Sequence, residues 1–151
     1  MKTLGVISDT HGLLRPAAVE ALAGCNAIVH AGDVGRPDVL AALEELAPLT
    51  AIRGNVDRWA DELADAAVLR FAGHAIYVIH DLNALDFDPA VAGIDIVIAG
   101  HSHRPLIRED NGVLYLNPGS AGPRRFSLPV TLATVTFANG QTDARLVELD
   151  V

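Results

Sequence analysis

The residues Lys2-Thr3-Leu4-Gly5-Val6-Ile7-Ser8-Asp9-Thr10-His11-Gly12 join a short apolar run to an abrupt polar ending. The apolar part, 2–7, predicts a buried β-strand. In an extended backbone, residues two apart point to the same side, so Asp9 and His11 can converge on one point just beyond the strand. An oxygen and a nitrogen in that arrangement suit a metal ion. Taken alone, however, Asp-x-His is more often an ordinary turn.

The composition predicts one globular domain over residues 1–151. Half of the residues are hydrophobic and a fifth are charged, which is typical of soluble proteins. No apolar run approaches the roughly 18 residues that span a bilayer, and the amino terminus has no signal-peptide pattern. Cys25 is the only cysteine, so no internal disulfide can form, and we interpret it as a small buried residue. These features predict a cytoplasmic protein without a membrane partner.

The net charge of −8 argues against an extensive nucleic-acid-binding surface. An acidic protein can still hold a phosphate where bound divalent cations invert the local potential. Any recognition of phosphate is therefore expected at a local positive centre.

The first third of the chain alternates strand and helix patterns. Apolar runs at 27–31 and 49–53 predict two more buried strands, and helical patterns begin at Pro16 and Pro37, both plausible first-turn positions. Gly24 is expected to end the first helix. Three successive strand–loop–helix units favour a parallel sheet with right-handed crossovers.

The remainder predicts mostly β-structure. A hairpin is expected over 68–71 and 74–79, with His74 beginning an edge strand, and a short helix is expected over 85–91. Further strands are predicted at 95–99, 106–108, 113–116, 131–137 and 144–149. Asn139-Gly140, between the last two, is a strong signal for a two-residue hairpin turn.

Polar side chains follow five of the predicted strands. In open α/β sheets the carboxyl ends of parallel strands gather at one edge, where binding sites form. Nitrogen and oxygen donors suit Mn, Fe, Co, Ni or Zn, and the set fits two divalent metals that share a carboxylate. Glycine precedes three of these residues, which lets the backbone turn sharply. The candidate metal ligands are Asp9, His11, Asp33, Asn55, His80, His101 and His103. His30 lies inside a strand and is interpreted as a supporting residue.

In this order, Asp9-x-His11, Gly32-Asp33, Gly54-Asn55, His80 and Gly100-His101-Ser102-His103 resemble the signature of the calcineurin-like metallophosphoesterases. The short length and Val56-Asp57 resemble the small bacterial and archaeal phosphodiesterase branch, which shares its fold with the retromer subunit of eukaryotes. The resemblance implies an α/β fold, a four-layer αββα sandwich of two mixed sheets.

The resemblance also implies how the ligands divide between two metals. One metal would be held by Asp9, His11, Asp33 and His103, and the other by Asp33, Asn55, His80 and His101, with Asp33 bridging. Asp9, Asp33, Asn55 and His80 are the expected catalytic residues. Two positions depart from the family pattern. Val56 stands where many members have a His that acts on the leaving group, and Asp81 replaces a Gly after the fourth-motif His.

These observations predict a phosphoric ester hydrolase, namely a metal-dependent phosphodiesterase acting on a small phosphodiester substrate. Two divalent transition-metal ions, Mn first and Ni, Fe, Co or Zn as alternatives, would lower the pKa of a bridging water, and the resulting hydroxide would attack phosphorus. Because Val56 cannot protonate a leaving group, diesters with acidic leaving groups are expected to react faster than alkyl monoesters.

Several alternatives stay open at this point. One is a phosphomonoesterase or nucleotide hydrolase of the same fold, and another is a non-enzymatic protein-interaction scaffold. Exposed edge strands near the carboxyl terminus would permit a homodimer. Arg124 and Arg125 are either substrate contacts or a solvated basic turn.

Overall fold

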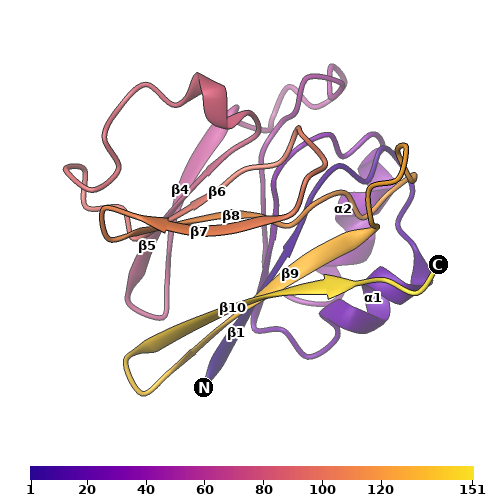
Figure 1. Ribbon diagram of the computed structural model, residues 1–151. Coiled ribbons are helices and arrows are strands. Elements are labelled where there is room, and N and C mark those ends of the chain that lie inside the picture. Colours follow the sequence, from indigo (N-terminus) through magenta and orange to yellow (C-terminus); the bar gives the residue numbers. More distant parts are fainter.

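The computed structural model describes residues 1–151, and its two five-stranded sheets pack face to face (Figure 1). The first sheet runs, in spatial order, β10 (Gln141–Glu148), β9 (Thr131–Ala138), β1 (Lys2–Ile7), β2 (Ala27–His30) and β3 (Leu49–Ala51). The second runs β4 (Ala66–Phe71), β5 (His74–Ile79), β6 (Ile96–Ile98), β8 (Val113–Asn117) and β7 (Leu106–Asp110). The helices are α1 (Pro16–Leu22), α2 (Pro37–Glu44) and the 3-10 helix η1 (Leu82–Ala84).

Both sheets are mixed, and each contains a group of three parallel strands. β1, β2 and β3 are parallel, as predicted, and so are β5, β6 and β8. Antiparallel partners flank each group: β9 beside β1, β4 beside β5 and β7 beside β8. The predicted fold class, two mixed sheets in an αββα arrangement, is confirmed. The parallel strands bring several carboxyl ends to the same edge of the molecule.

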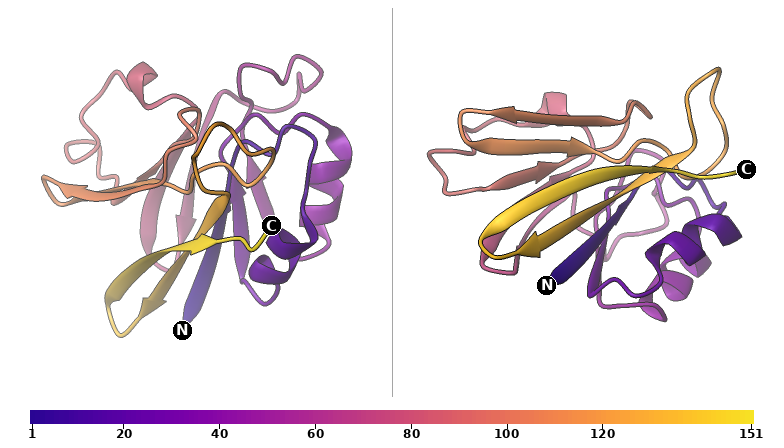
Figure 2. Two further views of the ribbon diagram at one scale, coloured as in Figure 1. Left: turned by 45° about the vertical axis from the view of Figure 1, so that its right-hand side comes forward. Right: turned by 60° about the horizontal axis from the view of Figure 1, so that its bottom comes forward.

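Three apolar clusters hold the layers together. Between the sheets lie Leu4 and Val6 of β1 against Ile76, Val78 and Ile98 of the second sheet. The other face of β1 packs through Ile7 against the inner residues of α1 and α2, and Cys25 belongs to the same cluster of buried side chains. A smaller cluster on the outer face of the second sheet is covered only by η1 and the segment that follows it. The two helices therefore lie on one side of the molecule (Figure 2).

Three details of the sequence prediction were wrong. No helix forms over 85–91, because Asp88 precedes Pro89, which disfavours helical backbone there, and the Asp88 carboxylate instead accepts from Ala90 N–H in a tight turn. The helix near this position is η1, which begins after Asp81. His74 does not begin an edge strand, since β5 lies between β4 and β6. The third strand–loop–helix unit lacks its helix, because β3 is followed by turns.

Other local predictions were confirmed. Pro16 and Pro37 occupy the first turns of α1 and α2. Asn139 and Gly140 both have positive φ and join β9 to β10 in a tight hairpin. β10 is an edge strand. None of the helices combines the length and apolar character needed to cross a membrane.

Candidate metal centre

The carboxyl ends of β1, β2, β5 and β6, together with the loop after β3, bring the seven predicted ligands to one region. Six of the seven form two groups, and within each group the candidate ligand atoms lie within 4.8 Å of one another. The first cluster is Asp9, His11 and His103; the second cluster is Asp33, His80 and His101. This division matches the one that the sequence resemblance implies.

The first cluster is centred on one carboxylate oxygen, Asp9 Oδ1. His103 Nε2 lies 3.4 Å from this atom and His11 Nε2 lies 3.9 Å from it. The other oxygen, Oδ2, accepts from the Ser8 hydroxyl at 2.7 Å and from His101 N–H at 3.1 Å. These two hydrogen bonds fix the carboxylate so that Oδ1 points to the imidazoles.

The second cluster surrounds Asp33 Oδ2. His80 Nε2 lies 3.2 Å from this oxygen, and Val56 N–H donates to the other oxygen, Oδ1, at 3.1 Å. Asn55 lies alongside, with one polar end of its amide 3.1 Å from His80 Nε2 and 3.3 Å from each Asp33 oxygen. All seven predicted ligands therefore lie in the two clusters or directly against them.

Asp33 connects the two clusters. Its Oδ2 lies 3.2 Å from His80 Nε2 in the second cluster and 3.6 Å from His11 Nε2 in the first. His80 Nε2 in turn lies 4.0 Å from Asp9 Oδ1. One carboxylate oxygen thus faces donors of both clusters, which is the position that a bridging ligand needs.

The backbone is strained at the ligand positions. Asp9, His11, Asp33, His101 and His103 all have φ between 47° and 69°, a left-handed conformation that non-glycine residues rarely adopt. Such conformations cost of order 1–3 kcal/mol each and persist only where the surroundings impose them. Their concentration in the two clusters indicates that side-chain convergence here is maintained at the expense of backbone stability.

Two glycines allow the loops to close around the carboxylates. A Cβ on Gly54 would lie 2.2 Å from Asp33 Oδ1, and one on Gly100 would lie 2.1 Å from Ser8 Oγ and 2.7 Å from Asp9 Oδ2. The sequence analysis predicts a sharp turn at these glycines, but of the three that precede ligands only Gly32 has positive φ, at 99°, whereas Gly54 and Gly100 allow close approach instead.

Histidine tautomers are set by backbone contacts. His80 Nδ1 lies 2.7 Å from Ala31 O, which only accepts, so Nδ1–H donates and Nε2 faces Asp33. Nε2 donates to Asp33 when the ring is protonated and offers its lone pair to a cation when the ring is neutral. Burial alone lowers the pKa of His80, but its hydrogen bonds to Asp33 and Ala31 raise it above the usual range. Burial likewise raises the pKa of Asp33, yet hydrogen bonds from His80 and Val56 N–H lower it to about 2. Both shifts show that this point attracts positive charge.

His30 supports both loops from behind, as predicted. Its Nδ1 accepts from Gly32 N–H at 3.1 Å, so Nε2–H donates to Thr10 Oγ1 at 3.0 Å, and the Thr10 hydroxyl donates to Val34 O. The ring is completely buried, and burial lowers the pKa of His30 to about 4. His30 is therefore a neutral spacer between the strand ends.

Asp57 has a role that the sequence analysis did not predict. Its buried carboxylate accepts from the N–H groups of Val34, Gly35 and Gly54 at 2.9–3.0 Å, which ties the loop carrying Asp33 to the loop carrying Asn55. The available signal was an Asp within a glycine-containing turn, a pattern that favours side-chain to backbone hydrogen bonds.

The two departures from the family pattern have different consequences. Asp81 adopts extended backbone, its Oδ1 accepts from Asn83 N–H at the start of η1, and its Oδ2 lies 3.9 Å from His101 Nε2. The Asp81 side chain therefore does not displace His80 from the second cluster. Val56 is partly exposed and offers only its backbone N–H to the site. Arg124 bonds Leu128 O within its own exposed loop.

The donor set fits divalent cations. Asp9 Oδ1 and His11 Nε2 are buried without a hydrogen-bond partner, although both point into the first cluster. Buried polar atoms rarely stay unpaired, so a ligand is expected at this point. In the second cluster the Asn55 amide faces both His80 Nε2 and Asp33. A cation at this point would be held by the Asn55 oxygen, whereas without one the Asn55 NH2 group would turn to donate to these two side chains. Imidazole nitrogens with carboxylate and amide oxygens suit first-row transition metals.

Comparison with known proteins identifies the family to which this chain belongs. The calcineurin-like phosphoesterase superfamily domain matches residues 1–140. The chain is 34% identical over 157 residues to a "Probable metallophosphoesterase" of Methanothermobacter thermautotrophicus, covering 95% of this chain and 91% of that protein. Two solved structures share the fold: Vps29 of Chaetomium thermophilum (TM-score 0.79, 17% identity, 99% and 97% of the chains covered) and an archaeal phosphodiesterase (TM-score 0.72, 21% identity, 96% and 99%). The chain therefore belongs to the calcineurin-like phosphoesterase superfamily.

Proposed function

We propose that the protein hydrolyses small phosphodiesters at a centre of two divalent metal ions, with Mn²⁺ as the preferred pair. The observation that carries this proposal is the position of Asp33 Oδ2, which faces His11 of the first cluster at 3.6 Å and His80 of the second at 3.2 Å. When bound, two such ions supply an activated water and neutralise the phosphoryl oxygens.

The chain's own residues hold this centre in position. Ser8 and the His101 N–H orient Asp9, while Val56 N–H orients Asp33. The Ala31 carbonyl fixes the His80 tautomer so that Nε2 faces the centre. Asn55 supplies a neutral oxygen, which adds a ligand without adding negative charge. Because these supports are formed before substrate arrives, little reorganisation is needed during the reaction.

A preference for diesters follows from the groups around the centre. Val56 cannot donate a proton from its side chain, so a good leaving group must depart unassisted. The site also contains two carboxylates and the nearby Asp81, which oppose the second negative charge of a monoester more than the single charge of a diester. Both effects favour an activated diester.

An activity screen tests the proposal. We expect the Mn²⁺-loaded protein to hydrolyse bis(p-nitrophenyl) phosphate with a higher kcat/KM than p-nitrophenyl phosphate, and alkyl monoesters more slowly still. Cyclic nucleotides belong in the same screen. Equal or better turnover of an alkyl monoester would indicate a phosphomonoesterase instead. Stoichiometric metal without turnover of any ester would favour the scaffold alternative.

A further inference from the structure

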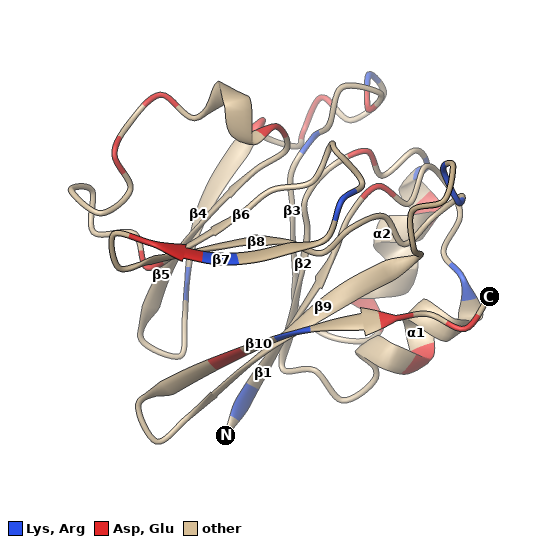
Figure 3. Ribbon diagram, viewed as in Figure 1, with Lys and Arg blue, Asp and Glu red and all other residues tan.

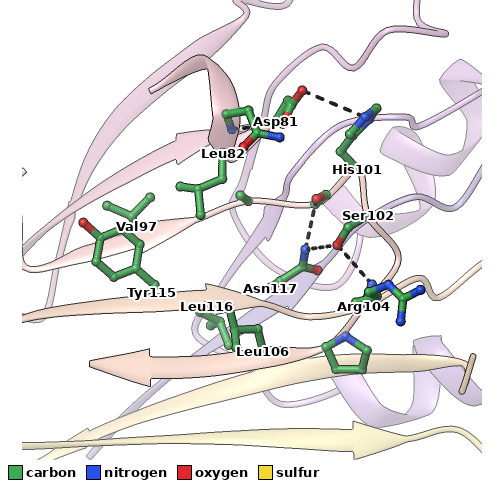
Figure 4. A pocket seen from close by; sticks show the side chains of 14 residues that line it. Asp81, Leu82, Val97, His101, Ser102, Arg104, Leu106, Tyr115, Leu116 and Asn117 are labelled. Atoms are coloured by element: carbon green, nitrogen blue, oxygen red, sulfur yellow. Dashed lines mark hydrogen bonds and ion pairs between the residues drawn. The ribbon is translucent and has the colours of Figure 1, made fainter. Parts of the chain in front are cut away.

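A cavity of about 450 Å³ opens on the outer face of the second sheet, beside the second cluster (Figure 4). Its floor is formed by Val97 of β6, by Ala99, which directly follows β6, and by Tyr115 of β8. Leu82 of η1 forms one wall and Leu106 of β7 forms another. The volume falls within the range of about 300–1,000 Å³ that is typical of small-molecule sites.

The cavity follows from the strand pattern and from the thin outer layer. Val97 and Tyr115 alternate with the core residues Ile96, Ile98 and Leu116, so they point away from the other sheet. Only the three-residue η1 covers this face near the strand ends. The Arg108 guanidinium lies 5.2 Å from the Tyr115 ring centre and holds the ring on the floor.

The cavity is continuous with the metal centre. His101 and Asp81 line it, and His101 is also a member of the second cluster. Nearly half of the His101 side chain is exposed, whereas His103 is buried. Figure 4 shows His101 and Asp81 at one end of the cavity and Val97, Tyr115 and Leu106 toward the other. A molecule with phosphorus at the second cluster can therefore extend one substituent into it.

Two polar side chains in the walls, Ser102 and Asn117, are already paired. Asn117 Nδ2 donates to Gly100 O and Ser102 Oγ, and Asn117 Oδ1 accepts from Gly119 N–H. The Ser102 hydroxyl oxygen also accepts from Arg104 N–H. The Asn83 amide and the Arg104 guanidinium line the cavity as well, whereas Leu82, Leu106 and the residues of the floor present mainly apolar surface to a ligand.

We propose that this cavity is the subsite for one ester group of the phosphodiester, and that it takes an uncharged aromatic group attached to phosphorus through oxygen. The proposal rests on the function proposed above and narrows its substrate class. A flat ring would lie between Leu82, Leu106 and the Tyr115 floor while the phosphoryl group stays beside His101. Burial of the ring would supply affinity that a methyl ester cannot obtain.

The test compares two unreactive ligands, phenylphosphonate and methylphosphonate, by calorimetric titration of the Mn²⁺-loaded protein. We expect phenylphosphonate to bind about tenfold more tightly or better. Ala99→Leu fills the floor and should remove that advantage without changing the Kd of methylphosphonate. Ala92→Leu makes the same change at an exposed position outside the cavity and should change neither Kd.

A second variant, Leu106→Ala, keeps the test valid if Ala99→Leu does not fold, because Leu106 is partly exposed on β7 and tolerates truncation better. It should reduce the advantage of phenylphosphonate. Equal binding of the two phosphonates, or an advantage that survives both variants, would overturn this inference alone. Absence of metal-dependent binding of either phosphonate would also overturn this inference. The proposed function itself fails only if the Mn²⁺-loaded protein hydrolyses no phosphodiester.

Discussion

The two clusters of the metal centre differ in how far they are open to solvent. In the first, Asp9 and His103 are buried and the only partly exposed ligand is His11. In the second, Asp33 and His80 are buried, but His101 and Asn55 are exposed. A buried ligand set holds a cation firmly, whereas an exposed set leaves positions for water and substrate. The first cluster is thus arranged for retention and the second for access.

The charged residues around the molecule support the same distinction. Acidic and basic side chains are scattered over strands and loops and form no single basic face in the view of Figure 3. On the proposed function, the attraction for phosphate would come from cations in the clusters, above all from the more accessible second one.

Asp33→Ala should have the largest effect, because Asp33 faces both clusters. Removing residues that only support metal ligands commonly costs 10–100-fold, so loss of a shared ligand should lower kcat/KM more than about 1,000-fold. Metal analysis should show that both equivalents are lost. Asp38→Ala, the same change at an exposed Asp of α2, is the control. Near-stoichiometric metal in Asp33→Ala would show that the two clusters do not share this carboxylate.

Asp57→Ala should separate stability from ligand chemistry at the second cluster. It leaves the N–H groups of Val34, Gly35 and Gly54 without their acceptor, and unpaired buried donors cost about 1–3 kcal/mol each. We expect urea denaturation to show a free energy of unfolding lower by about 3 kcal/mol or more. Asp61→Ala, at a fully solvated carboxylate, should change it by less than about 0.5 kcal/mol. A similar loss of stability in both variants would show that the hydrogen bonds of Asp57 do not hold the two loops together.

Much of the fold and site could be predicted because the decisive signals are local. Each ligand lies just beyond an apolar run, and parallel strands oblige such ends to meet. The glycines before Asp33, Asn55 and His101 were informative for a related reason, since backbone approaches too closely there for a side chain. These signals need no knowledge of distant contacts.

The parts that could not be predicted depend on contacts between distant segments. Asp57 clamps two loops, but nothing in the sequence shows which N–H groups it will find. His74 was misplaced because a hairpin strand does not reveal its second neighbour, here β6. The cavity beside His101 depends on how η1 sits against β6 and β7, which the sequence does not show.

Substitution of one imidazole in each cluster tests whether the exposure of a ligand determines how much it contributes to metal binding. His103→Ala removes a buried ligand that water cannot easily replace. The Kd of the tighter Mn²⁺-binding step should therefore rise about 100-fold. His101→Ala removes an exposed ligand, and water can take its place, so only the weaker step should change, by about tenfold. Calorimetric titration with Mn²⁺ measures both, and His74→Ala serves as the control. Equal effects of the two changes would mean that exposure does not distinguish the clusters.

The smallest expected effect concerns His30, which supports the loops of both clusters. Its pKa is about 4 in the folded protein and about 6.5 when unfolded, so the unfolded chain binds the proton more readily. Stability is therefore full above pH 6.5 and falls as the pH is lowered toward 4. For this group the loss between pH 7 and pH 5 should be about 2 kcal/mol. Urea denaturation of the metal-free protein at both pH values should show a steeper decline than in His30→Gln, which cannot titrate. Parallel pH profiles of the two proteins would show that the pKa of His30 is the same in the folded and the unfolded chain, and that burial does not hold the ring neutral.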